Sequence, residues 1–492
     1  MQTEIKILNE NNTWTLVSKP KETKVLKNKW VFKLKRQQDG TVEKYKARLV
    51  ARGDQQKEGI DYDEVYAPVA RLETIRTLLA ISAIKKMHVH HMDVVSAYVQ
   101  GDLTENIYME QPKLFAESGM EDLVCKLNKP LYGLKQSGRE WYRKLDGYLT
   151  HIGFCKTPIN PCVYIETKET SDIIIVIYVD DLLIASKDLE ELKRVKSLLN
   201  NKFKMKDLNN VQNILGICVD RVGNTGKIRL SQRRYIEDML DRFNMTECNP
   251  VSTPIELNLC IADITPNADT KVEIIDKPYR ELVGCLNYLS SATRPDIAFA
   301  TNILSRFCNN PMEVHWKMAK RVLRYLNGTK KYALSYENVH EELTAYVDSD
   351  WGADTLDRKS CTGYVIKLAG GSISWLSRKQ KSVALSTMEA EYMGLSDLPN
   401  EHTKVYCDNQ SAIHLSKNNT HHARSKHIDI RYHFSREAQE RGDIIVNYIS
   451  TNNMTADIMT KPLAKNKHDI CINLLNLSET RDKTDVSMKG EC

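Results

Sequence analysis

The chain has 492 residues, 41% of them hydrophobic, so its length fits two to four globular domains and excludes a single small one. Its net charge is +6, and its 12 cysteines are scattered without a CxxC pair. This pattern argues against a disulfide framework and a zinc ribbon, and it favours reduced thiols inside a cell. The N-terminus lacks an apolar signal core and no apolar run reaches about 20 residues, so neither a signal peptide nor a transmembrane helix is expected.

Positive charge is concentrated near the N-terminus. Between Lys19 and Glu58, 13 Lys and Arg stand against 5 Asp and Glu, whereas the rest of the chain is close to neutral. Residues 29–36 and 45–53 alternate as strands do, around a turn at 39–40, and they predict a basic β-hairpin. A local anionic partner is therefore indicated, with nucleic acid as the first candidate and a solvated, lysine-rich surface as the alternative.

The remaining elements follow from periodicity and from breakers. Helices are predicted at 73–86, after the loop in 131–150, from an Asp188 N-cap onward, and at 279–292, 315–328 and 386–397. Strands are predicted at 88–101 (leading into a turn), 173–186 (two strands), 343–351, 360–370, 372–379 and 403–409. Residues 249–276 are rich in Pro, Thr, Asn and Asp and predict a long connection, and a second α/β unit begins near Glu341.

Two adjacent aspartates, Asp180 and Asp181, interrupt the apolar run IIIVIYVDDLLIAS. Burying them unpaired would cost several kcal/mol, so they are expected at a tight turn between two buried strands. A third carboxylate, Asp93, ends another apolar strand. Three such carboxylates around two Mg²⁺ ions would support in-line nucleotidyl transfer, and an exposed Asp-Asp turn is the alternative reading of the pair alone.

The chain resembles the Pol polyprotein of copia-type LTR retrotransposons over about residues 10–465. The motifs that carry the resemblance occur in the family's order: WVFKLK, KARLVARG, GIDYDEVYAPVARLETIR, MDVVSAYVQGDL, IYMEQP, PLYGLKQSGREWY, YVDDLLIAS, YRELVGCLNYL, TRPDI, HWKMAKRVLRYLNGT, DSDWGAD, STMEAEY, CDNQSAI, KHIDIRYHF and ADIMTKPL. The resemblance implies an α+β chain: a right-hand polymerase with fingers and palm (1–245), a thumb or connection (246–340), a ribonuclease H-like α/β domain (341–465) and a tail (466–492).

For the polymerase, the resemblance assigns the metal-binding carboxylates to Asp93, Asp180 and Asp181, with the Val94 carbonyl as a further ligand. Tyr98 would pack under the sugar and select dNTPs, and Gln136 would contact the incoming nucleotide and template. Lys46, Arg48 and Arg52 are the candidates for holding the triphosphate, without a choice among them. The implied partners are an RNA or DNA template-primer, dNTPs and an RNA–DNA hybrid, and the implied cofactor is Mg²⁺, with Mn²⁺ as an alternative.

For the ribonuclease H, the resemblance places four metal-binding carboxylates on Asp348, Glu391, Asp408 and Asp457. Asp350 competes with Asp348, because residues two apart on a strand share a face, and Glu389 competes with Glu391. Asp348 and Glu391 are preferred. In the basic segment near Lys426, His427 is a candidate for substrate contact, with a plain surface role as the alternative.

The sequence departs from the family between Glu391 and Asp408, where only 16 residues intervene and Pro399 ends the helix early. The family has a longer stretch here that packs the ribonuclease H core. We therefore expect impaired ribonuclease H activity, since a misplacement of about 1 Å can cost about a hundredfold in rate.

Two functions stay open. One is an RNA-directed DNA polymerase with a C-terminal ribonuclease H, and the other is a catalytically inactive transposon remnant that binds nucleic acid. The motif series argues against a third function, a structural protein unrelated to nucleic acid. The sequence has no DSG or DTG protease motif, no His-His-Cys-Cys module and no zinc knuckle, so a fragment of a transposon reading frame is expected. The family implies cytoplasmic and nuclear stages, and no nuclear signal selects between them.

Overall fold

The computed structural model describes residues 1–21, 23–36, 42–168, 172–223, 226–265, 275–339, 342–398, 403–417 and 437–480. Helices and strands are interspersed throughout these ranges, which confirms the predicted α+β class. No helix within them is long and apolar enough to cross a membrane. The predicted hairpin turn at 39–40, the helix stop at Pro399, the substrate contacts of His427 and Lys426, and residues 481–492 of the predicted tail lie outside the described residues.

The chain forms two compact units, each made of separate stretches of sequence. The first contains residues 1–71 and 88–211, and the second contains residues 72–87 and 212–492. This division is coarser than the four predicted segments, whose bounds stay predictions.

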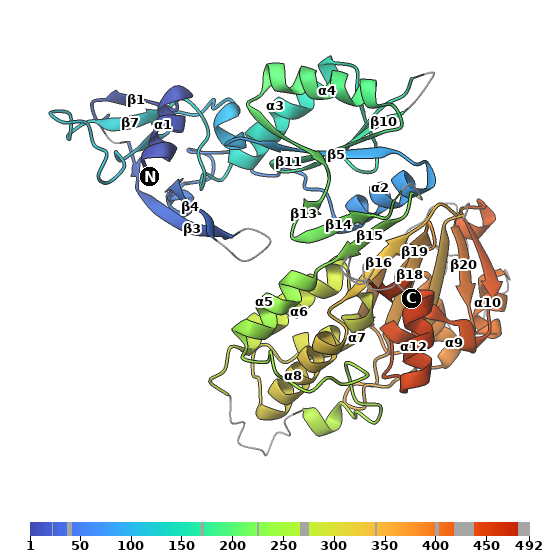
Figure 1. Ribbon diagram of the computed structural model, residues 1–492. Helices are drawn as coiled ribbons and strands as arrows, with labels where there is room; N and C mark the ends of the chain where they lie inside the picture. The colour runs from blue at the N-terminus through green and yellow to red at the C-terminus, as the bar shows by residue number, and fades with distance from the viewer. Residues whose placement is uncertain are drawn as a thin grey trace, which may run out of the picture. The chain divides into compact units, whose positions relative to one another are not determined.

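The first unit is centred on a six-stranded sheet with the order β12-β5-β11-β10-β9-β8. Its strands are β5 (His88–Val94), β8 (Cys155–Lys156), β9 (Val163–Glu166), β10 (Ile173–Tyr178), β11 (Asp181–Ser186) and β12 (Met205–Asn210). Figure 1 shows helices α3 (Ser137–His151) and α4 (Leu189–Lys202) on one side of these strands. Trp141 and Leu145 of α3 and Leu192 of α4 pack into the core with the apolar strand residues. The predicted N-cap is confirmed, since the Asp188 carboxylate accepts the Glu190 N–H at 2.8 Å.

The rest of the first unit surrounds the basic hairpin. It comprises α1 (Gln2–Glu10), a four-stranded sheet of β1 (Trp14–Val17), β7 (Val124–Leu127), β6 (Tyr108–Met109) and β2 (Val25–Leu26), and the antiparallel pair β3 (Asn28–Arg36) and β4 (Val42–Ala51). Leu8, Leu26 and Leu49 are buried together and join α1, β2 and β4 in one core. The hairpin predicted from the alternation is therefore confirmed, and its strand β4 is anchored in this core through Leu49.

The second unit contains two sheets and a helical layer. One sheet has the order β13-β14-β15-β16-β22, with strands β13 (Asn213–Ile214), β14 (Ile217–Arg221), β15 (Ile228–Ser231), β16 (Tyr332–Tyr336) and β22 (Leu477–Glu479). The helices are α5 (Arg233–Arg242), α6 (Tyr279–Ala292), α7 (Ala298–Ser305) and α8 (Glu313–Gly328). Leu282 and Leu286 of α6 and Leu323 of α8 lie in their common core. The helices predicted at 279–292 and 315–328 are thus confirmed.

A buried ion pair lies within this helical layer. Arg294 and Asp296 have side-chain exposures of 1% and 0%, and the guanidinium donates to the carboxylate at 2.9 and 2.7 Å. Tyr325 of α8 donates its hydroxyl to the same carboxylate at 2.6 Å, and Arg294 also donates to the carbonyl of Thr329 at 3.1 Å. Every charge in this pair is therefore met by a protein partner.

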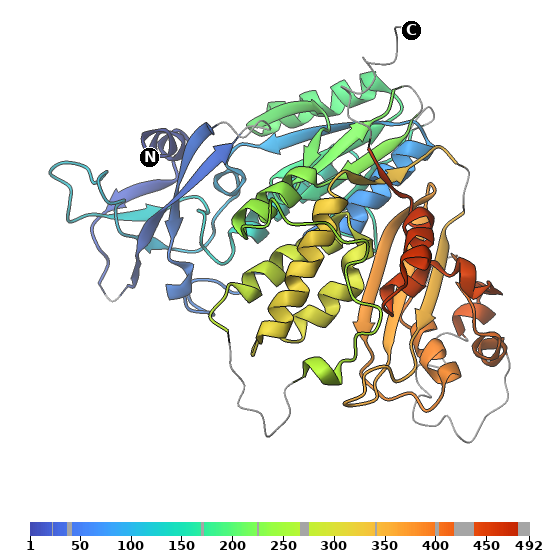
Figure 2. The same ribbon diagram turned by 60° about the horizontal axis from the view of Figure 1, so that its bottom comes forward.

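The other sheet has the order β19-β18-β17-β20-β21. Its strands are β17 (Thr344–Ser349), β18 (Cys361–Leu368), β19 (Gly371–Lys379), β20 (Thr403–Cys407) and β21 (Ile444–Tyr448). β17, β20 and β21 are parallel to one another, and β18 and β19 continue antiparallel from β17. Helix α9 (Thr387–Leu395) packs on β17 and β18, and α10 (Gln410–Lys417) packs on α9 and β21. Figure 2 shows α12 (Lys465–Leu474), in red, beside the orange strands.

The helix predicted at 73–86 is confirmed as α2 (Leu72–Ile84), but it belongs to the second unit. The contacts of Arg76 show why α2 belongs to the second unit. Its guanidinium lies 3.9 Å from the Trp375 ring centroid and donates to the carbonyls of Ile373, at 2.7 Å, and Ser291, at 2.6 Å. No local periodicity could have revealed these partners, which lie more than 200 residues away along the chain.

Candidate functional site

Asp93 and Asp181 stand opposite each other on the neighbouring strands β5 and β11. Tyr178 pairs with Asp181, so the predicted tight turn is confirmed, but Val179 and Asp180 form it and Asp181 is the first residue of β11. Val179 has φ +55°, a left-handed conformation that is unfavourable for a β-branched residue. The indole N–H of buried Trp141 donates to the Val179 carbonyl at 2.8 Å, and this bond holds the turn in place. The three predicted polymerase carboxylates are therefore brought to one edge of the sheet.

The carboxyl group of Asp180 lies in an environment that disfavours its charge. Its pKa is raised to about 6, mainly by burial and also by repulsion from Asp93 and Asp181, while Arg48 and Lys46 oppose the rise. One carboxyl oxygen, Oδ1, is buried without a hydrogen-bond partner. A cluster of carboxylates with an unsatisfied buried oxygen fits a divalent cation, and Mg²⁺ prefers such oxygen ligands.

Asp181 has a partner that the sequence reasoning did not identify. His91 Nε2 lies 2.7 Å from Asp181 Oδ1, and this imidazole is almost fully buried. The strand alternation places His91 on the same face as Asp93, so the signal was present in the sequence, but a role beside Asp181 could not be read from it. Val94 donates its N–H to the Asp180 carbonyl at 2.9 Å, while its own carbonyl as a metal ligand stays a prediction.

Tyr132 is a second residue that the reasoning missed, although it lies in the quoted motif PLYGLKQ. Its ring packs against that of Tyr98 with centroids 4.7 Å apart, and the Arg48 guanidinium lies 4.5 Å from its centroid. The Tyr132 hydroxyl is 3.5 Å from Asp180 Oδ2. Burial and the Asp180 charge raise the pKa of both tyrosines, so the hydroxyls stay protonated. Tyr132 thus joins the predicted sugar gate to the carboxylate turn.

Gln136 faces the protein interior. Its buried side chain accepts from Gln56 Nε2 at 3.0 Å and donates to the Asp61 carbonyl at 2.9 Å. These bonds tie the loop before α3 to the segment after the basic hairpin. The predicted contact between Gln136 and a nucleotide stays a prediction.

The three basic candidates occupy different environments. Lys46 and Arg48 lie two residues apart on β4 and so share a face, and both act electrostatically on Asp180. Arg52 follows the strand and makes two bonds to exposed Asp54, at 2.8 and 2.7 Å. The geometry favours Lys46 and Arg48 over Arg52 as groups that face the carboxylates, and their hold on a triphosphate stays a prediction.

A cavity of about 320 Å³ adjoins this edge of the sheet. Its wall includes Tyr98, Trp141, Val179 and residues 133–135 and 67–69. Tyr98 and the strained turn residue Val179 therefore border the same space, whose wall is mostly apolar apart from Lys135 and Ser137.

The loop that carries Tyr132 is fixed by two glycines that leave no room for a side chain. A Cβ on Gly133 would lie 2.1 Å from the Ala51 carbonyl oxygen, and a Cβ on Gly53 would lie 1.9 Å from the Gly133 carbonyl oxygen. Gly133 also has φ +97°. The end of the basic hairpin and the PLYGLKQ loop are consequently in backbone contact.

Gly133→Ala is expected to destabilise the chain by about 2 kcal/mol or more, because it adds both backbone strain and a clash with main-chain atoms. Urea unfolding checks this value. Gly147→Ala in the middle of α3 is the matched control, since nothing lies within 4 Å of its added Cβ and alanine favours a helix. Equal unfolding midpoints for the two variants would contradict the packing described for Gly133.

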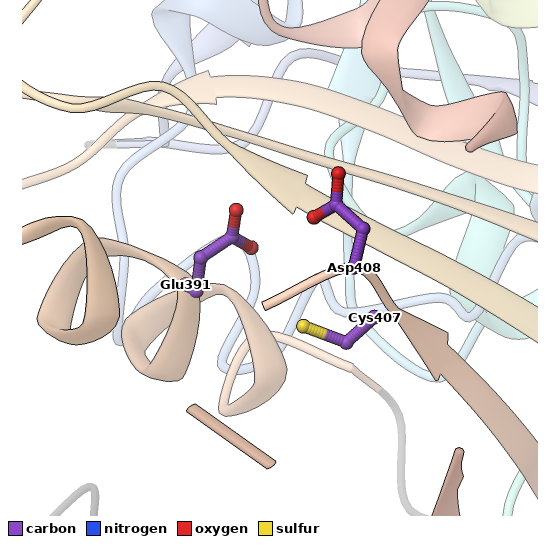
Figure 3. Close-up of side chains that lie close together, drawn as sticks. All are labelled: Glu391, Cys407 and Asp408. Carbon is purple, nitrogen blue, oxygen red and sulfur yellow. The ribbon is translucent and has the colours of Figure 1, made fainter. Parts of the chain in front are cut away.

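The second group of predicted carboxylates meets in the second unit. Asp348 lies near the end of β17, Asp408 directly follows β20, and extending the parallel register by two residues brings them level. Glu391 of α9 and Asp408 lie within 4.8 Å of each other, measured between carboxylate oxygens (Figure 3). Asp457 lies in the short 3-10 helix Thr455–Met459 and, like Asp408, raises the pKa of Asp348. The structure therefore brings all four residues together.

The geometry distinguishes the two alternatives in each ambiguous pair, Asp348 from Asp350 and Glu391 from Glu389. The pKa of Asp348 and that of Asp350 are both raised to about 6, mainly by burial. Asp457 and Asp408 are among the main further causes for Asp348, whereas the carboxylate that acts most on Asp350 is Asp348. Burial, Asp348 and Asp408 raise the pKa of Glu391 well above its ordinary value. Glu389 instead accepts the Leu385 N–H at 2.7 Å at the start of α9, as an N-terminal capping residue does. These contacts favour the preferred Asp348 and Glu391, whose metal binding stays a prediction.

Three further residues contact the second carboxylate group and were not predicted. Lys461 Nζ lies 2.7 Å from Asp457 and 3.3 Å from Asp348, and Lys467 Nζ lies 2.8 Å from Asp457. Thr460 donates its hydroxyl to Asp348. The two ammonium groups partly compensate carboxylates that are almost fully buried. Lys461 lies inside the quoted ADIMTKPL motif and Lys467 follows it, and neither charge pattern nor spacing indicated that these side chains point inward.

The shortened stretch after Glu391 does not leave α9 unsupported. Ala390, Tyr392 and Met393 are essentially inaccessible to solvent, and the helix ends at Leu395. The expected loss of apolar packing around Glu391 is therefore not seen in the described residues. The expected effect of the shortened stretch on ribonuclease H activity stays a prediction.

Comparisons with known proteins agree with the residues just described. The family described as "Reverse transcriptase (RNA-dependent DNA polymerase)" matches residues 11–257. The Retrovirus-related Pol polyprotein from transposon TNT 1-94 of Nicotiana tabacum is 44% identical over 97% of this chain, and that from transposon RE2 of Arabidopsis thaliana is 37% identical over 94%. The chain spans 37% and 33% of the lengths of these two relatives.

A shorter relative is covered almost completely. The putative transposon Ty5-1 protein of Saccharomyces cerevisiae is 34% identical over 62% of this chain and 98% of its own length. Among solved structures, a foamy viral protease-reverse transcriptase in complex with an RNA/DNA hybrid aligns with 98% of this chain and 56% of its own, at a TM-score of 0.47 and 12% identity.

Proposed function

The chain belongs to the reverse transcriptase family, as part of a copia-type transposon Pol polyprotein, and from this we propose that it is an RNA-directed DNA polymerase using two divalent metal ions. The observation that supports this most is the meeting of Asp93, Asp180 and Asp181 at one strained turn, with Asp180 Oδ1 buried and unpartnered. When bound, Mg²⁺ would activate the primer hydroxyl and stabilise the leaving pyrophosphate.

The chain's own residues do the positioning. Trp141 fixes the turn and His91 holds one oxygen of Asp181, and neither residue bonds to the unpartnered Oδ1 of Asp180. Lys46 and Arg48 supply positive charge opposite the carboxylates, where a triphosphate would lie. The β3–β4 hairpin as a whole presents a basic strand surface to a template-primer, whose binding should weaken as salt rises.

We further propose that Tyr98 and Tyr132 act together as the sugar gate, because the rings are in contact and Tyr132 is held by Arg48. Tyr132→Leu is expected to reduce the preference for dNTPs over rNTPs by about 3- to 10-fold, the equivalent of an aromatic pair worth ~0.5–1.5 kcal/mol. Single-nucleotide incorporation with dNTP and rNTP measures this ratio. Tyr132→Phe is the matched control and should retain it, because the ring remains, and a loss in this variant would assign the selectivity to the hydroxyl.

The second unit supports a second activity, cleavage of the RNA strand of an RNA–DNA hybrid. The supporting observation is the convergence of Asp348, Glu391, Asp408 and Asp457, with one oxygen of Glu391 buried and unpartnered. This oxygen-rich donor set fits Mg²⁺. Lys461 and Lys467 compensate Asp457, and a bound cation would add to that compensation.

Primer extension tests the polymerase proposal. Purified chain is incubated with an RNA template, a DNA primer, dNTPs, and Mg²⁺ or Mn²⁺, and a thermal melt is recorded with and without dNTP and metal. Extension together with ligand-dependent stabilisation is expected, because ligands that bind only the folded state raise its stability. Salt-sensitive binding of the template-primer without extension would support the alternative, an inactive remnant that binds nucleic acid.

A further inference from the structure

Cys407 is the last residue of β20, and its thiol lies inside the second carboxylate group. The Cys407 sulfur, a Glu391 carboxylate oxygen and an Asp408 carboxylate oxygen all lie within 4.8 Å of one another. Figure 3 shows the three side chains converging from helix α9 and from the end of β20. We propose that these three residues form a mixed sulfur–oxygen site for a thiophilic divalent cation of the Zn²⁺ class.

A second observation also points to a ligand at this position. Glu391 is 5% exposed, and its Oε2 is buried with no hydrogen-bond partner. A buried carboxylate oxygen without a partner is costly, and a cation between it and the sulfur would remove the cost. The Cys407 sulfur is fully buried, and it lies 3.4 Å from the backbone nitrogen of Asn409 and 3.9 Å from its carbonyl oxygen.

The combination of one thiol and two carboxylates favours Zn²⁺ over Mg²⁺. Mg²⁺ takes oxygen ligands in near-octahedral geometry, so the thiol adds nothing to its binding. Zn²⁺ accepts thiolate and carboxylate together, and thiolate favours it strongly. Tetrahedral Zn²⁺ with ligands at about 2.0–2.3 Å would place the ligand atoms about 3.5 Å apart, so the three side chains would need to close by about 1 Å. Water would complete the coordination.

Binding has a defined proton balance. The S–H bond of Cys407 breaks, the sulfur keeps the electron pair and donates it to the cation, and the proton passes to solvent. Neither carboxylate changes its covalent state, and no oxidant or reductant is involved.

The site shares Glu391 and Asp408 with the ribonuclease proposed above, so Zn²⁺ would compete with Mg²⁺ for these oxygens. Cys407 then makes the second carboxylate group sensitive to thiophilic metals, whereas Asp93, Asp180 and Asp181 have no described cysteine among their contacts. The inference concerns binding and holds for the chain regardless of hybrid cleavage.

Cobalt(II) is a spectroscopic probe for the site, because a thiolate bound to it gives a near-ultraviolet charge-transfer band. We expect the full chain, freed of metal, to develop this band with one equivalent of Co²⁺ and to lose it when Zn²⁺ is added. Cys407→Ser should abolish the band. Cys155→Ser, which removes an exposed thiol in the first unit, should leave it unchanged.

Glu391→Gln is the second variant, and it keeps the thiol. We expect it to weaken Co²⁺ binding about a hundredfold or more, since even outer partners of metal ligands are worth about 10- to 100-fold. If serine at position 407 prevents folding, as judged by circular dichroism, Glu391→Gln and Asp408→Asn decide the question together. A band that survives Cys407→Ser, or an affinity unchanged by both carboxylate variants, would overturn the site.

Hybrid cleavage in Mg²⁺, measured on the same samples, separates this inference from the proposed nuclease. A chain that binds Co²⁺ through Cys407 but does not cleave retains the metal site and loses the proposed nuclease activity. A chain that cleaves the hybrid but shows no charge-transfer band has the proposed nuclease activity and lacks the Cys407 metal site.

Discussion

Replacing Asp180 with asparagine is expected to abolish primer extension and to raise the melting temperature of the metal-free chain. The loss should be at least about 10³-fold, the upper end for removing one preorganised electrostatic group from an active site. The gain in stability has a separate cause. The Asp180 side chain is half-buried, its Oδ1 is fully buried without a partner, and Asp93 and Asp181 repel it, so its charge destabilises the folded state when no cation is bound.

The raised pKa of Asp180 predicts how the stability gained by Asp180→Asn depends on pH. The pKa of Asp180 is raised to about 6 in the folded chain, above the ordinary 3.8, so the folded state binds this proton more tightly than the unfolded state does. Ionisation of Asp180 therefore lowers stability as pH rises from about 4 through 6. Asp180→Asn removes the penalty, which amounts to about 1–3 kcal/mol above pH 7. The melting temperatures of variant and parent should converge below about pH 4.

Asp188→Asn is the matched control for this experiment, because asparagine caps a helix as well as aspartate does. Extension and melting temperature should both stay at the parental level. An Asp180→Asn chain that still extends primers would exclude the role assigned to Asp180. A variant with unchanged stability at every pH would contradict the burial of its charge.

Asp296→Ala is expected to cause the largest loss of stability, about 3–5 kcal/mol, because it leaves the Arg294 guanidinium buried without its carboxylate. Arg294 outweighs the effect of burial and holds the pKa of Asp296 below its ordinary value, so the pair is ionised in the folded chain. Tyr325 would also lose the acceptor for its hydroxyl. Urea unfolding, followed by tryptophan fluorescence, measures the change.

A double variant, Arg294→Met with Asp296→Leu, distinguishes the cost of an orphaned charge from the value of the pair. It should recover most of the lost stability, because apolar side chains of similar volume often replace a buried ion pair without penalty. Glu313→Ala, which breaks the solvent-exposed pair with Lys277, should produce no measurable change. A double variant as unstable as Asp296→Ala would show that the pair's hydrogen bonds, and not its charge balance, carry the stability.

The local parts of this structure were predictable from the sequence because short-range rules govern them. The turn at Asp180 follows from the cost of burying two carboxylates, and the helix beginning after Asp188 follows from its cap. Asp93 could be recognised as a third carboxylate at the end of an apolar strand, but its pairing with Asp181 depends on strand order, which no local pattern gives. The family resemblance brought together Asp348, Glu391, Asp408 and Asp457, although periodicity alone gave no reason for them to meet.

What the sequence could not supply depends on contacts between distant segments. Tyr132 reaches Asp180 across 48 residues, and Lys461 reaches Asp348 across 113, so no local pattern marks either one. The bonds from the Gln136 amide to Gln56 and Asp61 could not be read from the motif either, and its contact with a nucleotide stays a prediction. Side-chain direction in an irregular loop follows from tertiary packing, and a motif records only position.

The placement of α2 has a consequence for dividing this chain experimentally. Residues 72–87 lie in sequence between β4 and β5 of the first unit, but their buried side chains and Arg76 belong to the second unit. A protein cut after residue 211 would carry an unsupported apolar helix and be prone to aggregate, while its C-terminal counterpart would lack the partner of Trp375. The two halves are therefore not separable at one peptide bond. Soluble production of the first unit calls for a short flexible linker in place of residues 72–87, and the second unit needs that helix supplied in trans or fused to its start.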